Sequence, residues 1–336
     1  MKVDRITEFD RFLEAEEEWN SLLDASGLDC VFLTHEWFRT FWECLSGKNS
    51  LEVLLFKDER DHICGAAPMM ADGRNLRFIA SHEVTDYCDF LYLEEHKEEF
   101  FESLLRYLGE NYPDRSNMEF INIRSSSSTC GLIPQLASTY GFAHSLNETE
   151  VAPVLSVPST YGDYMKSLKR KNRHEIRRKL KRLERLEGIK VKKITETRHL
   201  LPAVKNFISL HAQSSPQKQA FWTTEGMPDF FTQIVHRFSQ NGWVEMNVLF
   251  FENSLISALL NFLYSDEVLF YNVAYDQDYA PFSPGFYLFH ASIVEAISRG
   301  KSRVDFLRGR EKYKYDFGAK ECKIYSLILK RGESAG

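Results

Sequence analysis

The pattern of apolar and polar positions divides the chain into two stretches that share one order of elements. In the first, it predicts helices over 10–23 and 34–45, strands over 51–56, 63–70 and 76–80, a short strand over 89–93, a helix over 97–108 and a strand over 118–123. In the second, it predicts helices over 199–212 and 228–239, strands over 244–251, 255–264 and 268–274, a helix from about 286, and a strand over 304–307. Helix, helix, three strands, helix and strand thus occur twice, which predicts a duplicated mixed α/β fold.

The boundary between the two stretches is predicted near residues 151–159. Pro153 and Pro158 interrupt both the helical and the strand periodicity there. The chain has 336 residues, enough for two domains with their own cores. We therefore expect an N-terminal domain over 1–152 and a C-terminal domain over 153–336.

The most informative stretch runs from residue 267 to residue 318. A β-branched and aromatic strand is followed by a loop with Pro and Gly, then by a helix whose apolar face includes Phe286 and Ile293 and which Gly300 ends. A second short strand follows, and a strand, crossover helix and strand favour parallel pairing. The loop brings Ser283-Pro284-Gly285 to the helix start, where unpaired N–H groups and the helix dipole favour an anion. This pattern predicts a phosphate site.

Several residues of this stretch, in one order, match a known family pattern: Ala274, Asp276, Tyr279, Ser283-Pro284-Gly285, Gly300, Asp305-Phe306-Leu307-Arg308-Gly309 and Tyr313-Lys314. The string resembles the second half of the Gcn5-related N-acetyltransferase (GNAT) fold as it occurs in CelD/BcsL acyltransferases of cellulose and exopolysaccharide synthesis. In the first half, Phe32 to Trp42, the strand from Gly65 to Met70 and Thr85 to Phe90 are also similar to that family.

The resemblance implies two tandem GNAT-like domains, an α/β (α+β) fold in which each domain has a mixed, mostly antiparallel sheet flanked by helices. In the first half, Ser81-His82-Glu83-Val84-Thr85-Asp86 stands where the second half has its Ser-Pro-Gly loop. Three titratable side chains and no glycine make a poor phosphate cradle. We therefore expect a degenerate first domain that shapes the acceptor cleft, with Asp86 and Tyr87 as candidate substrate-binding residues, and a second domain that binds acyl-CoA.

The net charge of −6 is unevenly distributed. Residues 1–150 carry 13 basic and 29 acidic side chains, and residues 151–336 carry 29 basic and 19 acidic ones. The segment 166–193 alone has 14 basic and 3 acidic residues, a net charge of +11. The helix predicted to carry this charge begins at Thr160-x-x-Asp163, which resembles a capping box with Asp in place of Glu. One face of it is predicted to hold Tyr161, Tyr164, Leu168, Ile176, Leu180 and Leu183.

This basic segment has two interpretations that the residues leave open. It is either a solvated amphipathic helix or an anion site. Its string KRKNRHEIRRKLKRL resembles a basic segment of the FemABX aminoacyltransferases, in which an arginine helps to hold a sugar-nucleotide diphosphate. By motif position the resemblance implies Arg173, with Arg177 one turn later, as substrate-binding residues. The planar guanidinium suits this role because it grips phosphate oxygens in pairs.

The resemblance also implies the chemistry of the site. The donor pyrophosphate would meet the helix start at Ser283, Gly285, Phe286 and Tyr287. Candidate catalytic residues are Asp276, to take the amine proton, Tyr279, to protonate the leaving thiolate, and Lys314, to polarise the carbonyl. Structural roles remain alternatives to these catalytic roles. Asp276 could cap a turn, Tyr279 could pack as an aromatic ring, and Asp305 and Arg308 could form a structural ion pair.

Composition sets further expectations. The six cysteines are scattered without a Cys-x-x-Cys pair and the histidines lack ligand spacing, so we expect reduced thiols and no metal. No apolar run is long enough to span a membrane, although peripheral association through the basic segment is compatible with the sequence. The acidic N-terminus has no apolar signal core, which predicts a cytoplasmic protein.

The resemblance implies an N-acyltransferase that moves an acyl group, expected to be acetyl, from acyl-CoA to an amine. The resemblance implies an amino sugar or sugar-nucleotide acceptor in cell-surface polysaccharide biosynthesis. One alternative keeps the fold and uses an aminoacyl-tRNA donor, as FemABX enzymes do; apart from that tRNA, no nucleic-acid partner is expected. The other alternative is a non-catalytic protein that binds polyanions through the basic helix over 166–193.

Overall fold

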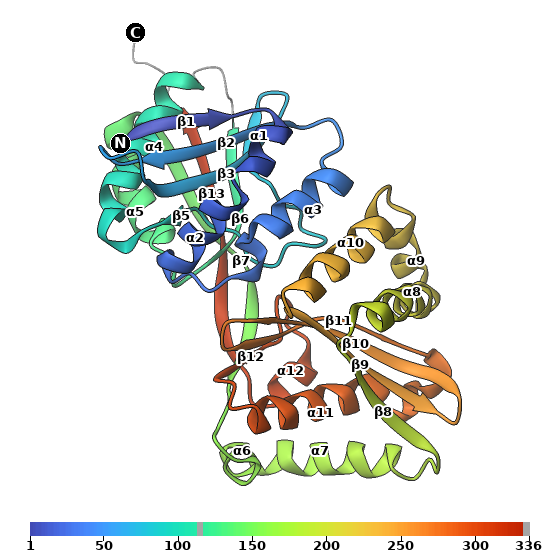
Figure 1. The fold of residues 1–336 in the computed structure, drawn as a ribbon. Coiled ribbons are helices and arrows are strands. Elements are labelled where there is room, and N and C mark those ends of the chain that lie inside the picture. Colours follow the sequence, from blue (N-terminus) through green and yellow to red (C-terminus); the bar gives the residue numbers. More distant parts are fainter. Residues whose placement is uncertain (113–116, 332–336) are drawn as a thin grey trace. The chain divides into compact units, whose positions relative to one another are not determined.

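The computed structural model describes residues 1–112 and 117–331 and resolves the chain into two compact units. The first unit comprises Met1–Glu150 together with the chain from Lys323 onward, and the second comprises Val151–Cys322. Figure 1 shows that each unit is built around a twisted sheet with helices packed against it. The strand β7 (Phe142–Ser156) carries the chain into the second unit, and β13 (Lys320–Arg331) carries it back.

The sheet of the first unit is mostly antiparallel. Its order is β1-β2-β3-β4-β6-β13, with β13 also bonded to β7 and the short β5 paired with β3. One pair is parallel, β4 with β6, in the register Asn75↔Asn117. The strands are β1 (Lys2–Ile6), β2 (Ser50–Lys57), β3 (Ile63–Asp72), β4 (Asn75–Phe78), β5 (Leu91–Tyr92) and β6 (Asn117–Arg124).

Helices cover this sheet because each has one apolar face. The predicted helix over 10–23 is two helices, α1 and α2, separated at Ala15. The core is rich in aromatic rings, with Phe78, Phe90 and Phe120 packed at centroid distances of 4.9–5.0 Å. The helices are α1 (Phe9–Glu14), α2 (Glu16–Ser26), α3 (His35–Leu45), α4 (Lys97–Asn111) and α5 (Thr129–Leu136), with one-turn helices η1 (Val31–Leu33), η2 (Glu94–His96) and η3 (Ala137–Tyr140).

The sheet of the second unit repeats the plan of the first. Its order is β8-β9-β10-β11-β12-β7, and its parallel pair joins β11 to β12. The two parallel pairs, β4 with β6 and β11 with β12, occupy the same place in the two orders, so the duplication predicted from the sequence is confirmed. The strands are β8 (Ile189–Ile194), β9 (Val244–Phe251), β10 (Ser254–Tyr264), β11 (Glu267–Tyr275) and β12 (Arg303–Asp305).

In the second unit α8, α9 and α10 lie on one face of the sheet, and α11 with α7 lies on the other (Figure 1). Buried residues of α11 such as Leu288 and Ile293 form one apolar cluster with Leu259 of β10 and Ile176 of α7. The helices are α6 (Tyr161–Ser167), α7 (Arg170–Leu183), α8 (Thr197–Gln213), α9 (Pro216–Thr223), α10 (Met227–Gln240), α11 (Pro284–Ser298) and α12 (Lys312–Asp316), with the one-turn helix η4 (Gln277–Phe282).

The basic segment differs from its prediction because it forms two helices. Thr160 caps α6 as predicted, its Oγ1 accepting from the N–H of Asp163. Leu168 then becomes extended, which buries its side chain, and α7 begins at Arg170. Tyr161, predicted on the apolar face, is 40% exposed and shares a hydrogen bond with His290. The predicted apolar face is therefore divided between two helices, and Tyr161 is not part of the buried face.

The C-terminal strand is the second difference. The predicted domain 153–336 includes it, yet from Lys323 the chain contacts the first unit, and Leu327 pairs with Phe120 of β6. The physical reason is the alternation of Leu327 and Leu329, both fully buried in the first unit's core. The periodicity of the sequence does not show which domain such a strand joins, because the edge of either sheet could pair with it if the apolar faces match.

Candidate active site

The candidate site begins where the two parallel strands of the second unit separate. β11 pairs with β12 only from Glu267↔Arg303 to Leu269↔Asp305, although β11 itself continues to Tyr275. Beyond Asp305 the chain turns away: Leu307 has a left-handed φ of 57°, and the N–H of Phe306 donates to the carbonyl of Pro153. The C-terminal half of β11 is therefore not paired with β12. An irregularity in the β10–β11 register, between Leu260 and Asn261, lies just where this separation begins.

The start of α11 presents free backbone donors beside this strand. Ser283 caps the helix in a left-handed conformation, and Pro284 at the first position has no N–H. The N–H groups of Gly285 and Phe286 have no acceptor among the described residues, whereas the N–H of Tyr287 donates to the carbonyl of Ser283 at 3.2 Å. Two of the predicted amide donors are thus free, and Tyr287 is a correction, because its N–H closes the first helical turn.

Gly285 allows a close approach between α11 and β11. A Cβ at this position would lie 3.2 Å from Cγ2 of Val273 and 3.7 Å from Cδ1 of Tyr275, both on β11. A side chain at this position would crowd Val273, so the helix start lies close to the strand. This close approach keeps the free amides next to the part of β11 that is not paired with β12.

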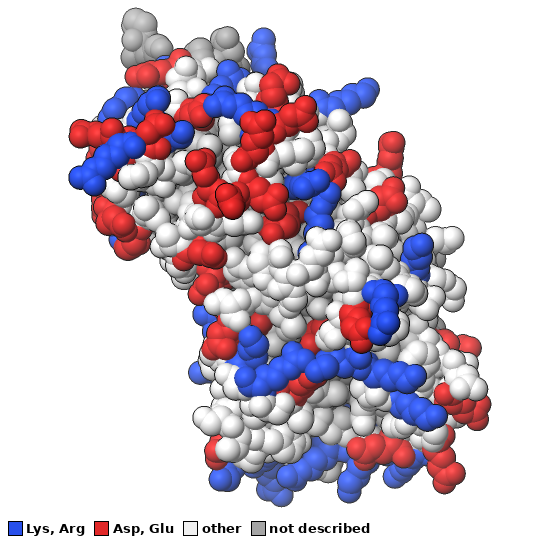
Figure 2. All heavy atoms as spheres, viewed as in Figure 1, with Lys and Arg blue, Asp and Glu red and all other residues white. Residues whose placement is uncertain are grey.

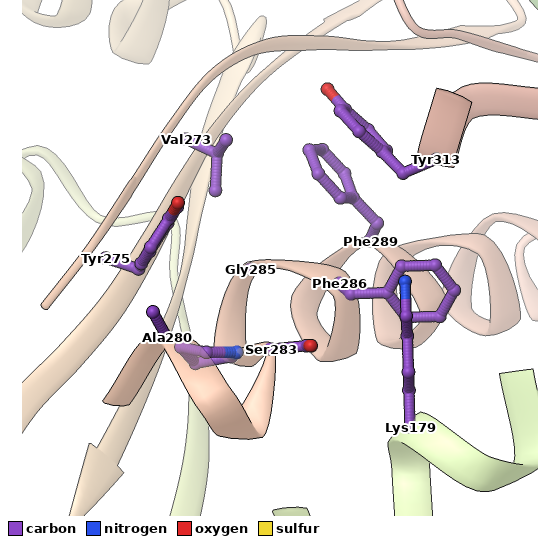
Figure 3. A pocket seen from close by; sticks show the side chains of 10 residues that line it. Lys179, Val273, Tyr275, Ala280, Ser283, Gly285, Phe286, Phe289 and Tyr313 are labelled. Atoms are coloured by element: carbon purple, nitrogen blue, oxygen red, sulfur yellow. The ribbon is translucent and has the colours of Figure 1, made fainter. Parts of the chain in front are cut away.

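A cavity of about 290 Å³ lies at this place. Figure 3 shows Lys179 extending from α7 to the ring of Phe286 in the first turn of α11, with Nζ 4.0 Å from the ring centroid. Lys179 is the charged member of the lining as far as the described residues go, and its side chain is only 19% exposed. The lining consists of Lys179, Val273, Tyr275, Ala280, Ser283, Pro284, Gly285, Phe286, Phe289 and Tyr313.

An arginine holds α7 against η4, the one-turn helix before α11. Arg182 donates from Nη1 to the carbonyl of Pro281 at 2.7 Å. Glu175 pairs with both Arg178 and Lys179, and its hydrogen bonds from Arg178 lower its pKa to about 2. One wall of the cavity is therefore a basic helix tied by a side chain to the turn that carries Ser283.

The predicted catalytic residues lie near the cavity in different situations. Asp276 caps η4, its Oδ1 accepting from the N–H of Asp278 at 3.0 Å. Tyr279 packs its ring on Phe251 at a centroid distance of 5.7 Å. Neither residue lines the cavity itself, although Ala280 and Ser283 of the same turn do.

Lys314 is buried, and its ammonium group already has three partners. Its Nζ donates to the carbonyls of Leu307 at 3.0 Å and Arg308 at 2.6 Å, and it pairs with Glu311 at 3.0 Å. These three partners match the three N–H bonds of an ammonium group. In this structure Lys314 therefore supports the turn after β12, and its predicted catalytic role would require the release of one partner.

The predicted substrate-binding residues divide between the units. Arg173 donates to the carbonyls of Met165 and Lys166 at 3.3 Å each, which caps the end of α6. Arg177 is exposed one turn later. In the first unit Tyr87 is buried, with the guanidinium of Arg124 4.8 Å above its ring, and Asp86 precedes it. Their roles in binding stay predictions.

The rest of α7 presents an exposed basic surface, visible along the lower edge of the molecule in Figure 2. In α7 and the residues that flank it, 169–185, the exposed basic side chains with no acidic partner among residues 1–112 and 117–331 are Lys169, Arg170, Lys171, Arg177, Lys181 and Arg185. We call these six residues the basic surface. Lys179 differs from them because it points into the cavity.

Sequence reasoning missed Lys179, Tyr275 and Tyr313 of the lining. Lys179 lies three residues after buried Ile176 and four before buried Leu183, so it borders the apolar face of α7. That spacing was the available signal, but it does not show which neighbour the lysine reaches. Tyr313 stacks on Phe289 at 5.0 Å, and burial raises its pKa. Only the tertiary contact shows that this ring borders the cavity.

The corresponding place in the first unit has a different character. There α4 follows the parallel-paired strand β4, and its first turn carries Glu98 and Glu99. Glu99 binds the N-terminal ammonium of Met1. Gly65 of β3 admits the ring of Phe100 so closely that a Cβ would collide with it. Carboxylates at the helix start and a filled interior both oppose an anionic ligand.

Among the described residues no group of His, Cys, Asp or Glu side chains is arranged to hold a metal ion. None of the helices in the described part of the chain combines the length and the apolar character that crossing a bilayer requires.

Comparison with known proteins agrees with this geometry. Residues 170–315 match the family model described as "Acetyltransferase (GNAT) domain". Among curated proteins no match to this chain is found.

Solved structures similar to nearly the whole chain include the following three. The crystal structure of FemX has a TM-score of 0.64 at 12% identity and covers 97% of both chains. The C-terminal domain of a putative lysylphosphatidylglycerol synthetase from Agrobacterium fabrum has a TM-score of 0.59 at 11% identity, over 94% of this chain and 92% of that one. A tandem GNAT protein from the clavulanic acid biosynthesis pathway has a TM-score of 0.53 at 10% identity, over 99% of this chain and 100% of that one.

At such low identity these likenesses establish the fold. They confirm the predicted architecture of two tandem GNAT-like domains. The matched segment 170–315 contains the separated strands, the free helix start and the cavity. The protein is an acyltransferase with a GNAT-type acetyltransferase domain in its second unit.

Proposed function

We propose that this protein transfers an acyl group from acyl-CoA to an amine. The observation that carries the proposal is the meeting, in one cavity, of the stretch of β11 that is not paired with β12 and two free amides at the start of α11. A pantetheine chain would lie along the free edge of β11, and its pyrophosphate would accept from Gly285 and Phe286. Lys179 would add a positive charge at the same end of the cavity.

The reaction requires a neutral amine, an oriented thioester and a route for two protons. The amine nitrogen would attack the thioester carbonyl, forming the C–N bond while the C–S bond breaks. Asp276 would take the amine proton, directly or through a water molecule, on the oxygen that does not cap the turn. Tyr279 would protonate the departing thiolate. Lys314 enters this scheme only if one of its three partners is released.

We further propose that the acceptor is an amino sugar or sugar nucleotide used in cell-surface polysaccharide assembly. Support comes from the sequence resemblance to the CelD/BcsL family over both halves. The fold likeness to FemX supports a second candidate, an aminoacyl-tRNA-dependent transferase. Release of free CoA from acetyl-CoA in the presence of an amine panel would favour the first candidate, and dependence on charged tRNA would favour the second.

A charge-reversal pair on α7 tests the donor site. Lys179→Glu places a carboxylate beside the free amides, whereas Lys181→Glu makes the same change in net charge on the basic surface. We expect Lys179→Glu to weaken acetyl-CoA binding by roughly tenfold or more and Lys181→Glu to change it little. Isothermal titration calorimetry with acetyl-CoA measures both.

The same pair separates the competing interpretations. Equal losses in the two variants would indicate a response to the overall charge of α7, as expected of a general polyanion-binding protein. If Lys179→Glu binds acetyl-CoA as tightly as the unsubstituted protein, the donor does not bind in this cavity. Titration with duplex DNA at low and at physiological salt completes the comparison, because polyanion binding weakens steeply with salt.

A further inference from the structure

Lys218 is a second unusual lysine of the second unit, on the side of the sheet opposite α11. It lies in α9, whose N-cap Ser215 accepts from its backbone N–H. Its Nζ lies 5.9 Å from the ring centroid of Tyr275, the last residue of β11. In the described parts of the chain, no carboxylate pairs with it. Burial alone lowers the pKa of Lys218, which agrees with the lack of a nearby negative charge.

The neighbours of Lys218 offer no compensating charge. His211 of α8 is buried, and its Nδ1 accepts from Nε1 of Trp222 at 2.9 Å. Burial and the charge of Lys218 lower the pKa of His211 to about 3, so the imidazole is neutral near pH 7. Because Nδ1 is the acceptor, the ring proton is on Nε2. Aromatic rings of Phe207 and Phe221 complete the surroundings of His211.

The place of Lys218 connects it with the candidate active site. Tyr275 contributes its ring both to the contact with Lys218 and to the cavity lining. Asp276, the candidate base, is the next residue along the chain. Lys218 therefore lies at the carboxyl end of β11, beside the residue that precedes the candidate base.

A half-buried ammonium group without a counter-ion is costly, and an anionic ligand would offset that cost. We propose that Lys218 binds an acidic group of the acceptor, so that the acceptor is an amine that also carries a phosphate or a carboxylate. This inference rests on the proposed function and specifies its acceptor class. The donor phosphates are assigned to the Gly285 end of the cavity, and Lys218 serves the other substrate.

Matched amines test the inference through specificity. The panel pairs glucosamine 6-phosphate with glucosamine, and glycine with glycinamide, with release of CoA from acetyl-CoA as the readout. We expect the full-length protein to prefer one acidic member, and Lys218→Met to lower that preference about tenfold or more, through KM. Lys218→Arg should retain much of the preference. Lys205→Met, an exposed lysine of α8, should leave it unchanged.

Two kinetic results would overturn the inference. One is an unchanged preference in Lys218→Met. The other is an equal fall in kcat for the acidic and neutral members, which would make Lys218 a group acting on the amine itself.

A labelling experiment tests Lys218 without turnover. Acetic anhydride modifies lysines, and peptide mass spectrometry follows Lys218 and Lys205 separately. We expect glucosamine 6-phosphate or glycine to protect Lys218, their neutral counterparts to leave it reactive, and Lys205 to respond to none of them. Inorganic phosphate is tested in the same way, because protection of Lys218 by phosphate would indicate a site for a phosphate group rather than for a carboxylate.

Failure of the donor proposal and failure of this inference give different results. If acetyl-CoA does not bind, the donor proposal fails, while the protection pattern still reports on Lys218. If no acidic compound protects Lys218, or if acetyl-CoA alone protects it and Lys218→Met weakens acetyl-CoA binding, the acceptor inference is wrong.

Discussion

At the scale of single residues, Lys314 shows how a structural role can resemble a catalytic one. It occupies a motif position that the family resemblance associates with carbonyl polarisation, yet it is buried and bonded to Leu307, Arg308 and Glu311. Leu307 has a positive φ that a branched residue rarely adopts, so the turn needs support. The ammonium group supplies that support by bonding two successive carbonyls.

We therefore predict that Lys314→Met lowers the free energy of unfolding by roughly 2 kcal/mol, because buried carbonyls lose their donor. Lys312→Met, an exposed neighbour in α12, should change it by no more than about 0.5 kcal/mol. Urea denaturation measures both. Unchanged stability with a large fall in kcat would instead support the catalytic role.

The buried carboxyl group of Asp89, in the first unit, makes the stability of the protein depend on pH. Its Oδ1 accepts from Oγ1 of Thr129 at 2.6 Å and from the N–H of Phe90 at 2.9 Å. Burial raises the pKa of Asp89 above its ordinary value of 3.8 despite these bonds. The folded state then binds the proton more tightly than the unfolded state, so this group stabilises the protein at low pH, and that contribution is lost as the pH rises through the folded pKa.

Asp89→Asn keeps both acceptor contacts and removes the titration. We predict that the free energy of unfolding of Asp89→Asn, relative to the unsubstituted protein, increases as the pH is raised from 3.8 toward neutrality. Denaturant unfolding at a series of pH values measures this difference. Parallel profiles for the two proteins would show that the carboxyl group does not titrate differently in the folded state.

At the scale of elements, the basic segment shows how one side chain decides where a helix ends. Helical periodicity continues through 160–183, but the chain breaks at Leu168, which packs under Gly318. Arg173 folds back to bond the free carbonyls of Met165 and Lys166 at the end of α6. The arginine that the sequence assigned to a substrate thus has a structural partner as well.

This arrangement predicts different costs for two arginines on one face of α7. Arg173→Met should lower the free energy of unfolding by about 1 kcal/mol, because the end of α6 loses its cap. Arg177→Met should have little effect, since that side chain is exposed. Thermal and urea unfolding test this directly. Equal effects in the two variants would show that the cap contributes nothing, and weaker acceptor binding in Arg173→Met alone would restore its predicted role.

At the scale of the whole molecule, the two units share a plan and differ in their interiors. Both contain a parallel pair in the same place of the sheet, and in each pair a structured loop and a helix connect the first strand to the second. In the first unit Phe90, Phe100 and Phe120 fill the interior, and acidic residues begin α4. In the second unit the equivalent space is a cavity with free amides and a lysine.

The difference predicts a single donor site. Calorimetry should give about one acetyl-CoA per chain, because carboxylates at the start of α4 repel an anion that the start of α11 attracts. Lys179→Glu is the internal control, since it should weaken the binding at that one site by roughly tenfold or more. A stoichiometry of two, or a full-strength site that survives in Lys179→Glu, would show that the first unit also binds the donor.

Much of the fold was predictable because its main elements have strong local patterns. β9, β10, β11 and α11 match their predicted ranges closely, and the parallel pairing of β11 with β12 followed from the strand, helix and strand order. β1, β7, β8 and β13 were missed. The exposed positions of β8 are mostly lysines, and β7 continues through Pro153, from which a boundary was predicted. The stretch 324–329 of β13 is mostly apolar, but its partner β6 is distant in the sequence.

The sequence by itself determined the duplication, the acyltransferase fold and the helix start at Ser283-Pro284-Gly285, because periodicity and turn chemistry are local properties. The tertiary structure decided which amides stay free, that Lys179 enters the cavity, that Lys314 is already bonded, and that Lys218 meets Tyr275. These contacts join residues that are far apart in the sequence and that only the packed fold brings together. A local sequence pattern therefore does not predict them.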